Sequence, residues 1–205
     1  RLGRAQSGSV GRLFLVEDFL HRVEMHDRVL VPRLEADAQR VGLLGRAFAV
    51  GLMDGAILPV MKHIPGHGRA QADSHLELPV VSASQAELEA RDLVPFRALA
   101  DLPAAMTAHV VFTDIDAGAP ASTSRIVHDR IIRGMIGFDG LLMSDDLGMK
   151  ALSGSMAGRA AAVIAAGSDV ALHCSGTLAE MIEARKADMA DALAHSKGAA
   201  AAVAA

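Results

Sequence analysis

Two spacings of apolar residues alternate along the chain from about residue 36 onward. Val41, Leu44, Phe48 and Leu52 recur every three or four residues, which is typical of a helix. Short, continuous apolar runs elsewhere are typical of buried strands. The pattern predicts helices at 36–52, 84–102, 123–138, 155–167 and from about 177 onward, and strands at 55–64, 104–115, 140–146 and 168–174.

Several residues predict where these helices begin, break or end. Ser84 and Glu87 have the spacing of a capping box, in which each residue bonds the backbone N–H of the other. Pro95 should kink or split the helix that follows. Ser124 is the expected cap of the next helix and Gly137 its expected end.

The alternation of strands and helices predicts a parallel sheet with crossover helices, either doubly wound or closed into a (β/α)₈ TIM-type barrel. Polar residues stand at the C-terminal ends of the predicted strands, in "KH", "HVVFTD", "SDD" and "HC". A barrel builds its active site at that rim, whereas the Gly-rich turn of a doubly wound dinucleotide binder is missing from the sequence. The barrel is therefore the favoured fold class.

The barrel is expected to be incomplete, because only four strands are clear and a barrel needs eight. We expect residues 36–205 to form the C-terminal part of a barrel domain. Residues 1–35 form a divergent segment with at most a helix and a strand. The chain begins with Arg1 rather than Met, which also fits a truncated or frame-damaged copy.

Composition narrows the range of partners. The formal net charge of -4 is spread along the chain, and Trp and Tyr are absent, so we expect no nucleic-acid partner. No apolar run is long enough to span a membrane. The single cysteine, Cys174, allows no internal disulfide, which suits a reducing compartment.

The segment "KHIPGHGRAQADSH" holds three histidines within residues 62–75. His63 and His67 are four residues apart, a zinc-pair spacing on a helix, but Pro65 and Gly66 between them break a helix. A tight loop without a metal is the favoured interpretation.

Asp73 and His75 are the better chemical pair in this segment. A carboxylate that accepts the imidazole N–H fixes the tautomer and makes a proton shuttle. The alternative is an ordinary surface pair. Lys62, at the end of a predicted strand, can bind substrate oxygens or pair with a carboxylate.

Two adjacent carboxylates, Asp145 and Asp146, end the apolar run "GLLMSDD". Burying charge is costly unless the group is paired, so at least one of them is a candidate metal ligand, general base or nucleophile. The alternative is structural: Asp146 caps the next helix, and Asp145 accepts backbone N–H groups.

As a set, "KHIPGHG" with "DSH", "TAHVVFTDID" and "GFDGLLMSDDLGM" resembles the family 3 glycoside hydrolases. More narrowly, the chain is similar to the bacterial β-N-acetylglucosaminidases of peptidoglycan recycling, from about Ala36 to Thr177. The chain departs from that pattern at Met135, where the family prefers a charged or amide residue. It departs again in residues 1–35, where neither Arg28 nor Arg33 can be assigned to an expected sugar-binding arginine.

The resemblance implies a role for each matching residue. Asp145 is the nucleophile, His75 the general acid and base, and Asp73 its partner, while Lys62 and His63 bind sugar hydroxyls. Asp146 is implied to be structural.

The activity that the resemblance implies is retaining removal of N-acetylglucosamine from anhydromuropeptides in the cytoplasm, without a cofactor or metal. A complete barrel is implied to be a monomer. Two alternatives remain: a phosphorylase, since a neutral His does not repel an anionic nucleophile, and a non-catalytic fragment with open sheet edges.

Overall fold

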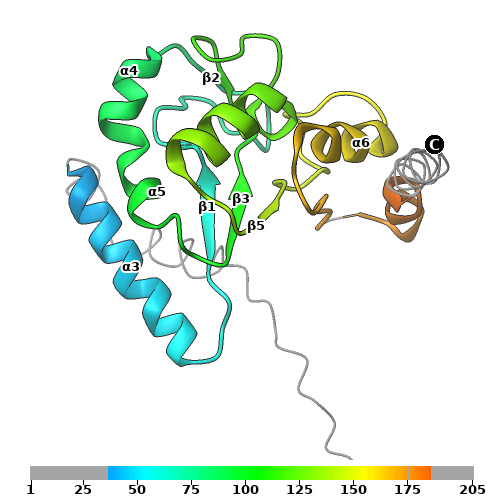
Figure 1. Cartoon of the computed structure of the whole chain (residues 1–205). Helices are drawn as coiled ribbons and strands as arrows, with labels where there is room; N and C mark the ends of the chain where they lie inside the picture. The colour runs from blue at the N-terminus through cyan, green and yellow to red at the C-terminus, as the bar shows by residue number, and fades with distance from the viewer. Residues whose placement is uncertain (1–36, 175, 186–205) are drawn as a thin grey trace, which may run out of the picture.

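The structure is a computed structural model that describes residues 37–174 and 176–185 (Figure 1). The predicted segment 1–35 and the end of the Ala-rich segment lie outside the described residues. The strands are β1 (Val60–Ile64), β2 (Val80–Val81), β3 (Ala104–Thr107), β4 (Val111–Phe112) and β5 (Leu141–Met143). The helices are α3 (Ala38–Asp54), α4 (Gln85–Glu87), η1 (Leu88–Asp92), α5 (Val94–Ala98), η2 (Ala121–Thr123), η3 (Val127–Ile136) and α6 (Met156–Ala166), and residues 178–185 are also helical.

The central sheet is parallel, as predicted, with the order β1-β3-β5. Val60 pairs with Ala104, and Ala104 in turn pairs with Leu141. Beyond β5, Met143 forms a parallel bridge with Val170. These segments therefore follow one another across the sheet in chain order. A doubly wound sheet would instead reverse its strand order part-way across.

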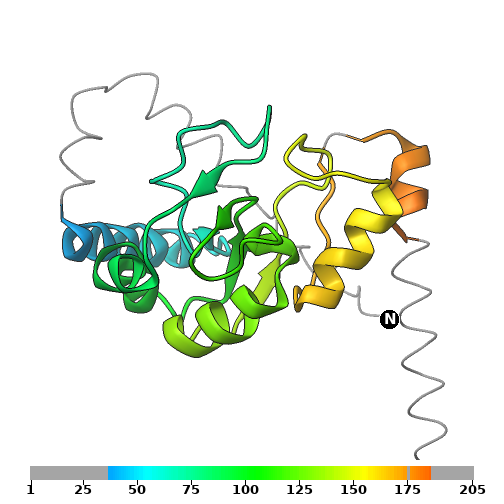
Figure 2. The same ribbon diagram turned by 90° about the horizontal axis from the view of Figure 1, so that it is seen from above.

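The helices lie in one arc on a single side of these strands, as the view from above shows (Figure 2). In that view α3 is blue, α5 green, η3 lime and α6 gold. A doubly wound sheet would carry helices on both faces, whereas a barrel keeps them on its outer side. The described residues thus form a sector of a (β/α)₈ barrel, which confirms the predicted fold class and its incompleteness.

The prediction of one strand over 104–115 was wrong. β3 ends at Thr107, and β4 pairs in parallel with β2 instead, in a separate two-stranded sheet. The backbone between them is tied to the η2 segment by two hydrogen bonds, in which Ser122 N–H donates to the Ala108 carbonyl and Ala121 N–H donates to the Val110 carbonyl. The two-residue strand β2 was missed because so short a run carries no periodicity.

The other three predicted strands are also shorter than expected, and of the predicted 140–146 only Leu141–Met143 is a strand. The segment 168–174 makes one bridge to β5 and several backbone hydrogen bonds to β5 and the chain just after it, but no regular strand. In the segment 55–64 only β1 is a strand, because α3 runs on to Asp54 and Gly55 caps it.

Most of the predicted helix boundaries are confirmed. Ser84 and Glu87 form the capping box, and the helix is interrupted at Leu93, just before Pro95. Ser124 Oγ accepts the N–H of Val127, and Gly137 ends η3 in the left-handed conformation at φ 77°.

Helix α3 packs on α5 through small residues rather than through its large apolar ones. Gly42 and Ala49 are its buried positions, and a Cβ on Gly42 would lie 3.1 Å from the Cβ of Ala98. Leu44 and Phe48 are exposed. The apolar spacing therefore predicted the helix, but the small residues determine which face is buried.

The main core lies between the sheet and the helical arc, with Ile64, Leu88, Ile131, Ile132 and Phe138 almost fully buried. Within 37–174 and 176–185, no helix has the length and apolarity needed to cross a membrane.

Candidate active site

Three strand ends bring polar residues to one edge of the sheet. Lys62 and His63 lie near the end of β1, His109 follows β3, and Asp145 comes two residues after β5. Because parallel strands point the same way, residues distant in the sequence meet at this edge.

Asp145 is a buried carboxylate, with 5% of the residue exposed. Its Oδ1 accepts the backbone N–H of Asp146 at 2.8 Å, and its Oδ2 lies 3.8 Å from His63 Nε2. The preceding Ser144 donates its hydroxyl to the Asp145 carbonyl and accepts the N–H of Leu172. One backbone N–H therefore orients the carboxylate, the Ser144 hydroxyl fixes the backbone that carries it, and a ring nitrogen lies beside it.

His63 is held largely in the neutral state. Burial lowers its pKa to about 4, and the charges of Lys62, His67 and His109 add to that shift, while Asp145 opposes it. The imidazole therefore offers a hydrogen-bonding edge at neutral pH rather than a cation. The Lys62 Nζ atom is also buried at this edge.

Asp146 has the structural role predicted as one alternative, although as a tether rather than a helix cap. Its Oδ1 accepts the backbone N–H groups of Gly148 and Cys174, each at 3.0 Å, and lies 3.3 Å from His173 Nδ1. One carboxylate thus ties the loop after β5 to the segment 173–174.

Asp73 and His75 pair as the spacing predicted. Asp73 Oδ1 lies 2.8 Å from His75 Nδ1 and accepts the His75 backbone N–H at 2.9 Å. These hydrogen bonds lower the pKa of Asp73. Both side chains are exposed, so the pair presents its free ring nitrogen to solvent. Within the described part of the chain, no hydrogen bond or ion pair joins this pair to Asp145.

The loop that carries the pair is shaped by other histidines. His67 Nε2 lies 3.2 Å from the hydroxyl of the buried Ser74, which spans the turn. The rings of His63 and His67 meet edge to face, with centroids 5.9 Å apart. Among residues 37–174 and 176–185 there is no group of three or more His, Cys, Asp or Glu side chains placed to hold a metal ion.

His109 is a site residue that the sequence reasoning did not single out. It is fully buried, its Nδ1 lies 2.7 Å from Ser122 Oγ, and its Nε2 lies 3.1 Å from the carbonyl oxygen of Asp146. Burial lowers its pKa, although Asp145 and Asp146 oppose the shift. A polar residue that interrupts the apolar run 104–115 was its signal in the sequence.

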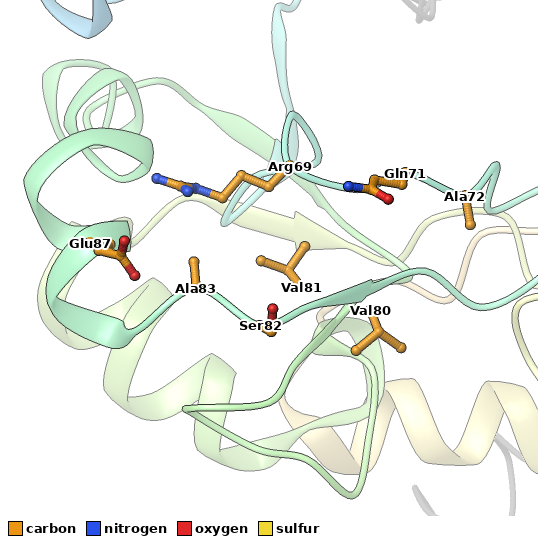
Figure 3. Close-up of a pocket in the computed structure, with 8 residues that line it drawn as sticks. All are labelled: Arg69, Gln71, Ala72, Val80, Val81, Ser82, Ala83 and Glu87. Atoms are coloured by element: carbon orange, nitrogen blue, oxygen red, sulfur yellow. The ribbon is translucent and has the colours of Figure 1, made fainter.

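A shallow hollow of about 510 Å³ lies between the loop after β1 and the β2 segment (Figure 3). Arg69 and Gln71 line one side, and Val81, Ser82 and Glu87 lie on the other. Asp145 does not line it, and Arg69 is paired with Asp92 at 2.9 Å. The hollow is therefore separate from the chemistry at the strand ends.

Comparison with known proteins identifies the family. The model of the glycosyl hydrolase family 3 N-terminal domain matches residues 33–199. The chain belongs to this family. Two curated relatives are both named β-hexosaminidase: one from Thiobacillus denitrificans is 42% identical over 144 residues, and one from Pseudomonas aeruginosa is 42% identical over 144 residues. These matches cover 68% and 69% of this chain, but only 40% and 43% of the relatives.

Solved structures give the same result. NagZ from Neisseria gonorrhoeae, in complex with N-trifluoroacetyl-D-glucosamine, matches with a TM-score of 0.62 and 40% identity over 68% of this chain and 41% of its own. A family 3 β-N-acetylglucosaminidase from Paenibacillus matches with a TM-score of 0.70 and 34% identity, over 73% and 29% of the two chains. This family 3 chain therefore spans well under half the length of these relatives.

Proposed function

We propose that this family 3 chain carries the catalytic half of a retaining β-N-acetylhexosaminidase. The observation that supports the proposal most directly is Asp145, a buried carboxylate held by a backbone N–H at the end of a barrel strand. The names of the curated relatives supply the activity class.

In the first step, an Asp145 oxygen attacks the anomeric carbon as the bond to the leaving oxygen breaks, and protonated His75 gives that oxygen a proton. In the second step, water attacks the same carbon, His75 takes the water's proton and the bond to Asp145 breaks. Two inversions give net retention of configuration. Asp73 keeps Nδ1 of His75 occupied, so that Nε2 is the nitrogen that exchanges the proton.

The proposed substrate is an N-acetylglucosaminyl-anhydro-N-acetylmuramic acid, with or without its peptide, and the proposed setting is cell-wall recycling in the cytoplasm. Lys62 and His63 bind hydroxyls of the N-acetylglucosamine ring in this proposal. A complete barrel would act as a monomer, without a metal or cofactor.

The test combines trapping with substitution in the full chain. A slow fluorinated N-acetylglucosaminyl donor should leave a covalent adduct on Asp145, located by mass spectrometry of peptides. Asp145→Ala should lower turnover of an aryl N-acetyl-β-glucosaminide by at least roughly 10³-fold, as loss of a nucleophile does. The matched control is Asp54→Ala, which removes an exposed carboxylate at the end of α3.

His75→Ala tests the acid–base role separately. It should lower turnover of a natural disaccharide by roughly 10²-fold or more, but affect an activated aryl leaving group less, because that group departs without a proton. An adduct on another residue, or inversion at the anomeric carbon, would refute the mechanism. N-acetylglucosamine 1-phosphate as the main product in phosphate buffer would make the chain a phosphorylase.

A further inference from the structure

An imidazole from the segment after β3, that of His109, contacts the backbone beside Asp145. His109 Nε2 lies 3.1 Å from the carbonyl oxygen of Asp146, and a carbonyl only accepts, so Nε2 carries the proton. In the neutral ring Nδ1 then accepts the hydroxyl proton of Ser122 at 2.7 Å. Both side chains are fully buried.

Ser122 is itself fixed. Its N–H donates to the Ala108 carbonyl at 3.1 Å, and the neighbouring Ala121 N–H donates to Val110 at 2.8 Å. These two bonds flank His109 in the sequence, so the hydroxyl that orients the ring is held by the same strand-end segment that carries the ring.

The residue that His109 holds is the one that binds the proposed nucleophile. Asp146 donates its N–H to Asp145 Oδ1 at 2.8 Å, and its carbonyl oxygen accepts from His109. A rotation of the Asp146 backbone would move the N–H that orients the carboxylate. The imidazole therefore acts on Asp145 through one intervening residue.

We propose that His109, oriented by Ser122, is a positioning residue that sets the Asp145 carboxylate for attack on the anomeric carbon. The inference rests on the proposed role of Asp145. In this role His109 transfers no proton. It acts through the hydrogen bond from its Nε2–H to the Asp146 carbonyl oxygen, which fixes the backbone beside Asp145.

His128 supplies a matched control. It is also buried, its Nδ1 donates to the Ser124 carbonyl at 2.9 Å, and its Nε2 accepts from Ser168 Oγ at 3.1 Å. It thus has the same two kinds of partner as His109, but it joins η3 to the segment after α6. Substitutions at His128 measure the general cost of losing a buried histidine.

Two substitutions separate positioning from packing. In His109→Gln the amide nitrogen can stand near the place of Nε2 and still donate to the Asp146 carbonyl oxygen. In His109→Asn the shorter amide stands near Nδ1, keeps the contact with Ser122 and loses that donor. If His109 had a purely structural role, both substitutions would lower kcat to the same extent, or neither would.

The measurements are kcat and KM on an aryl N-acetyl-β-glucosaminide and the rate of covalent labelling of Asp145, all on the full chain. We expect His109→Asn to lower kcat and the labelling rate by roughly 100-fold with KM nearly unchanged, since a small misplacement of a reacting group costs about that much. His109→Gln should retain most of the wild-type kcat and labelling rate. Ser122→Ala, which only loosens the orientation of the ring, should give values between those of the two His109 variants.

The possible outcomes are distinct. If the wild-type chain labels Asp145 but His109→Asn labels it as fast, or no slower than His128→Asn, the positioning role is wrong and the nucleophile stands. Equal loss in His109→Gln and His109→Asn also overturns it. If the wild-type chain is not labelled at Asp145, the proposed function itself fails, and the positioning role fails with it.

Discussion

His63 lies in β1 and Asp145 just after β5, and burial at this edge of the sheet sets the charge on the imidazole. The pKa of His63 falls from an ordinary value of 6.5 to about 4. Between these values the unfolded chain binds a proton that the folded protein does not, so folding stability falls as the pH falls through this window. Above pH 6.5 the contribution of this residue is constant.

This gives a measurable pH dependence. Between pH 7 and pH 4 the wild-type protein should lose less than about 3 kcal/mol of unfolding free energy through His63, because the side chain is 25% exposed and solvent screens part of the effect. His63→Gln should lack that part of the slope, measured by urea unfolding across the same range. His109 and His128 also have lowered pKa values, so only the difference between the two proteins isolates His63. Parallel slopes in the two proteins would show that folding does not lower the pKa of His63.

For single residues, the sequence predicted contacts only between side chains close together in the chain. The two-residue spacing of Asp73 and His75 predicted their contact, and the turn between them lets one carboxylate oxygen bond both the ring and the backbone. His109 could not be found in that way, because its partners lie 13 and 37 residues away.

Among the elements, the start of β5 packs closely against the backbone that precedes β3. A Cβ on Gly140 would lie 2.7 Å from the Pro103 carbonyl oxygen and 2.8 Å from that of Leu102. The next residue, Leu141, donates its N–H to the same Pro103 carbonyl at 3.0 Å. Gly140 therefore lets β5 reach the register with β3 that brings Asp145 to the site.

Gly140→Ala should lower the unfolding free energy by roughly 1–3 kcal/mol, the cost of forcing an extra methyl into a packed site. The control is Gly51→Ala in α3, where a Cβ meets no atom within 4 Å. That change should raise stability by about 0.5–1 kcal/mol, because alanine is the better helix former. Chemical denaturation of the two variants measures both effects, and a neutral Gly140→Ala would mean that β5 can shift without cost.

The helices were easier to predict than the strands, for a physical reason. Ser84, Glu87, Ser124 and Gly137 act on backbone groups within five residues, so their effects are local. The apolar run 104–115 divides into two strands because β4 pairs with β2 instead of continuing in the central sheet. Since β2 lies more than twenty residues earlier, no local pattern in the run shows this division.

For the molecule as a whole, local stability should differ sharply between the sheet and the loop that carries the proposed acid. Ala104, Ala105 and Leu142 are fully buried in paired strands. The loop of residues 66–79 has few backbone hydrogen bonds, and Leu76 on it is 67% exposed. Amides in poorly bonded, exposed segments open at low free-energy cost.

Hydrogen exchange followed by mass spectrometry tests this contrast. Among peptides from residues 37–174, those that cover 104–107 and 141–143 should exchange much more slowly than those that cover 71–78. A substrate analogue that contacts His75 should slow exchange in the loop while leaving the strands unchanged. If the loop exchanges as slowly as the strands without a ligand, His75 is fixed in place rather than able to move with the reaction.

The sequence alone determined the helices, the caps, the alternation of a barrel sector, and which residue types stand at the strand ends, because these depend on neighbours close in the chain. Only the tertiary structure decided that His63 lies 3.8 Å from Asp145, that His109 bonds the Asp146 carbonyl oxygen, and that Asp146 is a tether. Burial and contact between distant residues depend on the register of parallel strands. No local pattern encodes that register. The register also buries His63, and this burial lowers the pKa of its imidazole.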